Sequence, residues 1–103
     1  DVPLVAVLGV MEVESHFNPY EVSPKYARGL MQVMYKVWKK ELNLENKHEL
    51  HDIEKGIDSG VHVLRKYLDK EKNNMEKALK RYNGIGRGSD PAYVKKVYTA
   101  MGK

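Results

Sequence analysis

The sequence contains no cysteine among its 103 residues, which excludes a disulfide scaffold, a zinc–thiolate site and a thiol nucleophile. Its longest apolar stretch, residues 2–11, is far shorter than the ~20 residues that span a bilayer. It lacks both Gly-x-Gly-x-x-Gly after a strand and Gly-Lys-Ser/Thr, the two glycine-rich patterns of nucleotide loops. It also lacks His-Glu-x-x-His, so we expect no metal site and no cofactor.

The composition is that of one globular domain, because 42% of the residues are hydrophobic and 31% are charged. We find no repeat or linker and therefore treat residues 1–103 as a single domain, expected to be a monomer. The chain begins at Asp1 rather than methionine, which is compatible with a piece of a longer exported protein. Residues 1–60 carry 7 basic and 10 acidic side chains, whereas residues 61–103 carry 11 and 4. Such a basic half is typical of a solvated helical face or of a surface for a polyanion.

The dominant hydrophobic period is helical and predicts an all-α fold of about five short helices. We expect them over residues 2–14, 28–42, 53–68, 73–84 and 90–102. The first is apolar nearly throughout and should be buried on all sides. A capping box of Asn73 and Glu76 opens the fourth, and Asp90 with Pro91 opens the fifth. No segment alternates as a half-buried strand does, and residues 17–27 should form a loop.

Glu14 stands at the end of the apolar first helix, where a charge is unexpected. It shares a helical face with Met11, Val10 and Val7, three, four and seven positions earlier. An ionised carboxyl on an apolar face is costly, so we expect the pKa of Glu14 to be raised. A glutamic acid that is protonated near neutral pH can act as a general acid. The alternative is a carboxylate at the helix end that reaches water or pairs with Arg28.

The residues around Glu14 form an ordered series of short motifs. They run Glu14-Ser15-His16-Phe17-Asn18-Pro19, Ser23, Gly29-Leu30-Met31-Gln32, Gly56-Ile57-Asp58-Ser59-Gly60 and Arg81-Tyr82-Asn83-Gly84. In order and spacing they resemble the soluble lytic transglycosylase (SLT) catalytic domain, which is related in fold to goose-type lysozyme. That family's signature is Glu-Ser-x-Phe-Asn-Pro, a serine, Gly-Leu-Met-Gln, Asn-Ile-x-x-Gly and Ala-Tyr-Asn. The first two blocks align without a gap, and the resemblance covers nearly the whole chain.

The resemblance implies a single lysozyme-like helical domain with a substrate cleft. It also implies cleavage of the β-1,4 bond between N-acetylmuramic acid and N-acetylglucosamine in peptidoglycan, leaving a 1,6-anhydro ring on the muramic acid. One glutamate, Glu14 by its place in the motif, would protonate the leaving oxygen and then take the proton of the C6 hydroxyl. The partner would be the peptidoglycan glycan strand, with no nucleic acid expected. The place of action would be the cell envelope, periplasmic or extracellular.

The same resemblance assigns roles around the first two motifs. Ser15 would fix the start of the loop, and Ser23 would bond to Glu14 or to the N-acetyl group of the substrate. Gln32 would donate hydrogen bonds to a sugar. Gly29 would let the chain pass close to the sugar, although a glycine at a helix start is an equal alternative.

Further roles fall on the second and last motifs. Met34 would line the cleft with an apolar wall, or would simply be a core methionine. Tyr82 would place its hydroxyl near the acid, and Asn83 would hold the turn that follows it. The sequence departs from the family pattern at Tyr35, where a proline is usual, and at Gly56, where an asparagine is expected. Neither departure touches Glu14.

Three other functions stay open on the sequence alone. A hydrolase of the same bond would need a second carboxylate to activate water, and Glu21 is the other acid of the motif region. A wall-binding domain without catalysis would share the fold. A helix-hairpin-helix module that binds DNA is suggested by the glycine-rich residues 84–88 in the basic half, although Ser89-Asp90-Pro91 interrupts that pattern.

The position of Glu14 leads to a prediction on pH dependence. If one desolvated carboxyl performs both proton transfers, cleavage of peptidoglycan should have an optimum on the mildly acidic side of neutrality. The measurement is the initial rate of release of soluble fragments across the pH range. A rate that stays constant from roughly pH 5 to pH 9 would contradict the assignment of both transfers to this carboxyl.

Overall fold

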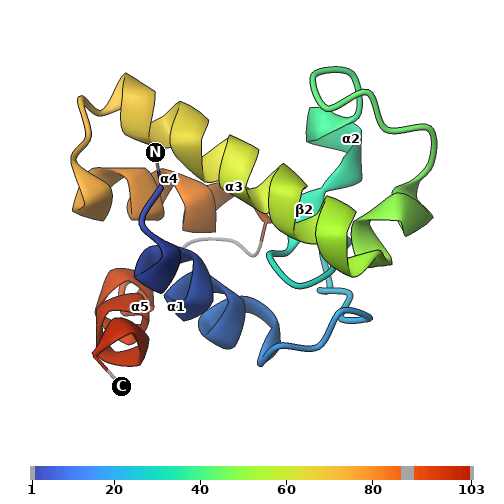
Figure 1. Cartoon of the computed structure of the whole chain (residues 1–103). Coiled ribbons are helices and arrows are strands. Elements are labelled where there is room, and N and C mark those ends of the chain that lie inside the picture. Colours follow the sequence, from blue (N-terminus) through green and yellow to red (C-terminus); the bar gives the residue numbers. More distant parts are fainter. Residues whose placement is uncertain (1, 87–89, 103) are drawn as a thin grey trace.

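The computed structural model describes residues 2–86 and 90–102, which form five α-helices, one 3₁₀ helix and a two-stranded antiparallel sheet. The elements are α1 (Leu4–Ser15), β1 (Ala27–Arg28), β2 (Val33–Met34), α2 (Tyr35–Trp38), η1 (Lys47–His51), α3 (Ile53–Lys70), α4 (Met75–Gly86) and α5 (Tyr93–Met101). Figure 1 shows α3 running across one side of the molecule, with α4 beneath it and α1 beside α5. The predicted all-α class is therefore confirmed, with the small sheet as an addition.

α3 is the longest element and lies over α4 and η1 (Figure 1). Asp52 begins it, because its carboxylate accepts a hydrogen bond from the Lys55 amide and caps the helix N-terminus. Its buried side chains include Leu64 and Tyr67, and the Tyr67 ring meets Trp38 of α2 edge-on at 5.9 Å between centroids. Within residues 2–86 and 90–102, no helix combines the length and the apolar character needed to cross a membrane.

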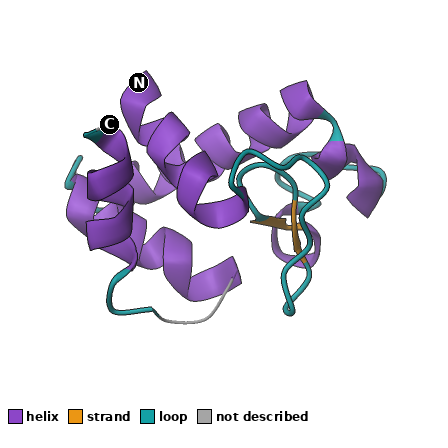
Figure 2. Ribbon diagram, turned by 90° about the horizontal axis from the view of Figure 1, so that it is seen from below, coloured by secondary structure: helices purple, strands orange, loops and turns teal. Residues whose placement is uncertain are grey.

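The predicted helix over residues 28–42 is wrong for most of its length. Residues 27–34 form a hairpin in which Ala27 pairs with Met34 and Arg28 pairs with Val33, and only four residues follow as α2. The reason is local, since Gly29 and Gln32 both adopt positive φ, at 84° and 54°, which an α-helix cannot contain. Figure 2 shows the small sheet surrounded by loops beside the helices.

Three smaller expectations also change. α1 is not buried on all sides, because Leu4, Val5 and Leu8 are between 42% and 72% exposed. The fourth helix is capped by Asn74, whose side chain accepts from the Lys77 amide, rather than by Asn73. That helix continues through Gly84 to residue 86, so the first part of the glycine-rich segment is helical. Residues 87 and 88 of the helix-hairpin-helix pattern, and residue 89 that follows it, lie outside the described residues.

Two glycines pack against one backbone carbonyl, that of Leu50 at the end of η1. A Cβ at Gly29 would lie 2.0 Å from the Leu50 oxygen, and one at Gly56 would lie 2.8 Å from it. Both distances are shorter than a side chain allows, so each glycine is needed for close backbone packing. Gly56 is also the position at which the sequence departs from the asparagine of the family pattern. It also ties the hairpin to the start of α3.

This packing gives a prediction on stability. Replacing Gly29 by alanine should lower the free energy of unfolding by at least about 2 kcal/mol, because the new Cβ meets backbone and the φ of 84° disfavours it. Gly84→Ala is the matched control, since its Cβ would meet nothing within 4 Å in a helix and should stabilise by about 0.5–1 kcal/mol. Urea unfolding of both variants measures the difference. If Gly29→Ala and Gly84→Ala changed the free energy of unfolding equally, the close packing at the Leu50 carbonyl would be refuted.

Candidate active site

Glu14 lies in the last turn of α1 and is buried, with 3% of its surface exposed. Its Oε2 accepts a hydrogen bond of 2.8 Å from the hydroxyl of Tyr93. The alternatives considered from the sequence, a carboxylate that reaches water or that pairs with Arg28, are therefore wrong. Arg28 instead contacts His51, with 3.3 Å between Nη1 and Nε2. Glu14 is the one buried acidic side chain among residues 2–86 and 90–102.

Tyr93 is the site residue that the sequence reasoning missed. It begins α5, is 3% exposed, and packs in the core together with Val97, four residues later on the same helical face. From this i, i+4 spacing the sequence could have predicted that the Tyr93 ring is buried with Val97. No local pattern could have paired its hydroxyl with a carboxyl 79 residues away. The bond fixes the orientation of Glu14 and joins α1 to α5.

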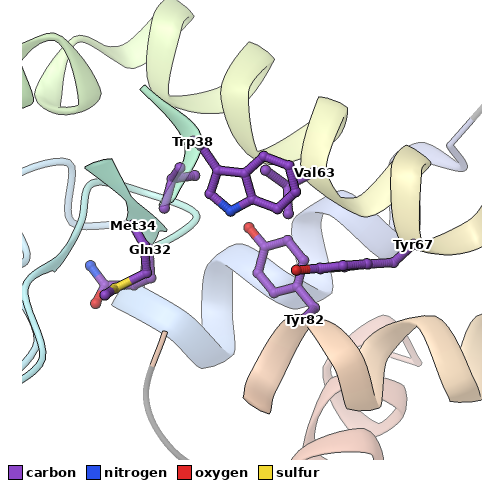
Figure 3. Close-up of a pocket in the computed structure, with 7 residues that line it drawn as sticks. Gln32, Met34, Trp38, Val63, Tyr67 and Tyr82 are labelled. Carbon is purple, nitrogen blue, oxygen red and sulfur yellow. The ribbon is translucent and has the colours of Figure 1, made fainter. Parts of the chain in front are cut away.

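Tyr82 comes from α4 and is also buried. Its hydroxyl donates to the carbonyl oxygen of Met31 at 2.6 Å, so it holds the hairpin rather than Glu14 itself. Burial raises the pKa of the Tyr82 hydroxyl well above its usual value, and the charge of Glu14 raises it further. The phenol is thus neutral and lies within electrostatic reach of Glu14. Figure 3 shows the Tyr82 ring between Tyr67 and the side chains of the hairpin.

The two motif serines are both buried and both engage backbone. The Ser15 hydroxyl lies 2.8 Å from the carbonyl oxygen of Leu30 and 3.2 Å from that of Met11, so it links the end of α1 to the hairpin. The Ser23 hydroxyl accepts from the amides of Lys25 and Ala27 at 3.3 and 3.0 Å. Both serines therefore shape the loop that follows Glu14, while contact of Ser23 with Glu14 or with substrate stays a prediction.

Gln32 has a different hydrogen-bonding capacity from the one expected. Its amide nitrogen donates to the carbonyl oxygens of Glu21 and Gly29, at 3.0 Å each. Both of its N–H groups are used in this way, so the expected donation to a sugar conflicts with this geometry. Its Oε1 is buried and has no hydrogen-bond partner. In this geometry Gln32 therefore holds the loop at Glu21 to the hairpin, and its enclosed Oε1 is not open to a ligand.

The hairpin, α2, α3 and α4 together enclose a small cavity of about 10 Å³, shown in Figure 3. Its lining includes Gln32, Met34 and Tyr82, and the half-buried Met34 also lines a larger groove outside.

Asn83 is 5% exposed and faces a separate hollow of about 270 Å³, together with Tyr93. The structure thus brings Tyr82 and Asn83 close to the residues around Glu14. Gly29 lies at the Leu50 carbonyl, and its approach to a sugar stays a prediction.

The other acids near the motifs are placed differently. The half-buried side chain of Glu21 accepts from the Asn18 amide nitrogen at 3.4 Å, and its backbone oxygen accepts from Gln32 and Gly29. Glu12, two residues before Glu14, is also only half-buried. Glu14 therefore combines burial with a neutral phenol donor, an environment that suits exchange of a proton with a bound ligand.

Comparison with known proteins shows the family to which the chain belongs. The family profile described as "Transglycosylase SLT domain" matches residues 1–103. The membrane-bound lytic murein transglycosylase C of Edwardsiella ictaluri is 36% identical over 97 residues, covering 81% of this chain and 27% of that protein. The protein of the same name from Histophilus somni (strain 2336) is 37% identical over 94 residues, covering 81% and 26%. This chain spans about a quarter of the length of these relatives.

Solved structures agree on the fold. The 70 kDa soluble lytic transglycosylase from Escherichia coli matches with a TM-score of 0.73 and 25% identity, over 99% of this chain and 17% of that one. A complex of the 70-kDa enzyme with bulgecin A matches with a TM-score of 0.74 and 24% identity. The fold is therefore the lysozyme-like helical fold of lytic transglycosylases. With a profile match over its whole length, the chain belongs to the transglycosylase SLT domain family.

The Tyr93–Glu14 bond gives a testable prediction. Tyr93→Phe keeps the ring but removes the donor to a buried carboxyl, and should lower the free energy of unfolding by about 1–3 kcal/mol. Tyr98→Phe is the matched control on α5, because Tyr98 is 41% exposed. Removal of the Tyr98 hydroxyl should lower the free energy of unfolding by less than about 0.5 kcal/mol. Chemical denaturation near neutral pH measures both. Indistinguishable costs would mean that the bond does not hold Glu14.

Proposed function

We propose that this domain cleaves the β-1,4 bond between N-acetylmuramic acid and N-acetylglucosamine in peptidoglycan, without water and with formation of 1,6-anhydromuramic acid. The observation that carries the proposal is the buried carboxyl of Glu14, held by the Tyr93 hydroxyl, at the glutamate position of the SLT motif. The names of the relatives, membrane-bound lytic murein transglycosylases, support the same reaction class.

The reaction takes place in two proton transfers on one carboxyl. Protonated Glu14 gives its proton to the glycosidic oxygen as the bond from that oxygen to C1 of the muramic acid breaks. The N-acetyl group of the substrate stabilises the cation that forms at C1. Ionised Glu14 then takes the proton of the C6 hydroxyl while that oxygen bonds to C1. Glu14 ends protonated, as it began, and no water is consumed.

The surroundings of Glu14 favour this one-carboxyl route over hydrolysis. An inverting hydrolase needs a second carboxylate about 6.5–9.5 Å from the acid, and a retaining one needs a nucleophile about 5–5.5 Å away. Glu21, the candidate for that role, turns its carboxylate to Asn18 and uses its backbone to hold the hairpin. Hydrolysis of the same bond remains the second candidate function.

The groups beside Glu14 suit a sugar ligand. Met34 supplies an apolar surface for a sugar, and Gln32 belongs to the proposed set through the hydrogen bonds with which it holds the hairpin beside Met34. Ser15, Ser23, Gly29, Tyr82 and Asn83 complete the proposed set, the serines and Tyr82 chiefly by shaping the hairpin and loop. The substrate places the site of action in the cell envelope, outside the cytoplasm, where the domain would work as a monomer.

Replacement of Glu14 tests the assignment. Glu14→Gln should keep the fold, because the amide oxygen can still accept from Tyr93, and should lower the cleavage rate by about 10²–10⁴-fold. Glu12→Gln is the matched control, since it removes the same charge two residues earlier and should leave most of the activity. The readout is soluble fragment release from purified peptidoglycan, with circular dichroism to confirm folding. A folded Glu14→Gln protein with wild-type rate would refute Glu14 as the acid.

A further inference from the structure

A groove of about 510 Å³ lies beside the β1–β2 hairpin, and all the charged side chains that line it are basic. They are Lys25 in the loop before β1, Arg28 in β1, Lys36 in α2 and Lys47 at the start of η1. The segments that supply them belong to the half of the sequence with a net negative charge. The basic character of the groove is therefore local, and it arises from the fold rather than from composition.

The three lysines of the groove make no ion pair with any residue the structure describes. Two acids in the neighbouring segments, Glu49 and Glu41, are engaged with other partners. Hydrogen bonds from Lys55, Asn46 and Glu45 lower the pKa of Glu49 to about 2. Glu41 binds His62 and Lys66 of α3. The positive charge of the groove is thus left without a counterion from these acids, which favours an external anion.

Arg28 is oriented towards this role by a neutral side chain. Because the carbonyl oxygen of Pro19 can only accept, the Nδ1 of His51, 2.8 Å away, must carry a hydrogen. Because a guanidinium can only donate, the Nε2 of His51 accepts from Arg28 at 3.3 Å. His51 is therefore neutral and holds the half-buried guanidinium without cancelling its charge. A planar guanidinium held in this way suits a carboxylate.

We propose that this groove binds the carboxylates of the peptides that peptidoglycan carries on its muramic acid residues, an inference that rests on the proposed function. Met34 lines both the groove and the small cavity beside Gln32 and Tyr82, so the groove adjoins the proposed sugar site. Tyr26 and Tyr35 add aromatic surface for the apolar parts of a peptide. A glycan strand at Glu14 would thus have its charged peptide beside the four cations.

The test measures binding in chains that carry Glu14→Gln, so that the strand is not consumed. The ligands are soluble glycan strands with their peptides and the same strands after an amidase has removed the peptides, and calorimetry gives both dissociation constants. The chain should bind peptide-bearing strands more tightly, and Lys36→Gln with Lys47→Gln should reduce that preference about fivefold to tenfold. Lys70→Gln with Lys77→Gln is the matched control, because these lysines are exposed on other helices and should leave the preference intact.

Each outcome of these binding measurements either supports or overturns the assignment of the groove to peptide carboxylates. A preference that is absent, or that survives the loss of Lys36 and Lys47, overturns the assignment of the groove. Equal binding of both strands, together with binding of a phosphodiester polymer that the groove variant loses, would assign the groove to phosphate instead. The proposed reaction is tested apart from this, since it is refuted if the wild-type chain releases no anhydro product. Preferential binding of peptide-bearing strands without such product would support the groove and refute the reaction.

Discussion

The hydrogen bond from Tyr93 to Glu14 connects the last helix of the described structure to the first, and it secures a carboxyl inside a largely apolar layer. A buried carboxyl without a partner would be strongly destabilising. The packing of α1 against α5 brings the phenol to the acid, so the fold supplies the donor that the acid needs. Tyr82 and Ser15 extend the same arrangement to the hairpin, through the carbonyls of Met31 and Leu30.

The sequence predicted the elements whose cause is local. The apolar period of residues 53–68 predicted α3 nearly to its ends. The position of Glu14 among valines and a methionine pointed to a buried acid, and the motifs pointed to the family. These predictions succeeded because a helical face depends only on residues a few positions apart in the chain.

The failures fall where distant residues decide. The segment after Gly29 has helical spacing, yet the Leu50 carbonyl and two positive φ angles make it a hairpin. Gln32 was expected to donate to a sugar, but the Glu21 and Gly29 carbonyls take its hydrogens. The Tyr93 contact could not be predicted for the same reason. What the sequence predicted well was the buried position of Glu14, and what it could not predict was the set of contacts that orients this carboxyl.

The central claim is that one buried carboxyl, with the C6 hydroxyl of the substrate as nucleophile, breaks the glycosidic bond. The most direct measurement is mass spectrometry of the soluble fragments that the chain releases from purified peptidoglycan. Our account predicts muramic acid ends lighter by one water than those of a hydrolysed strand. Hydrated reducing ends as the main product would contradict it, because they require water as the nucleophile and a second group to activate it.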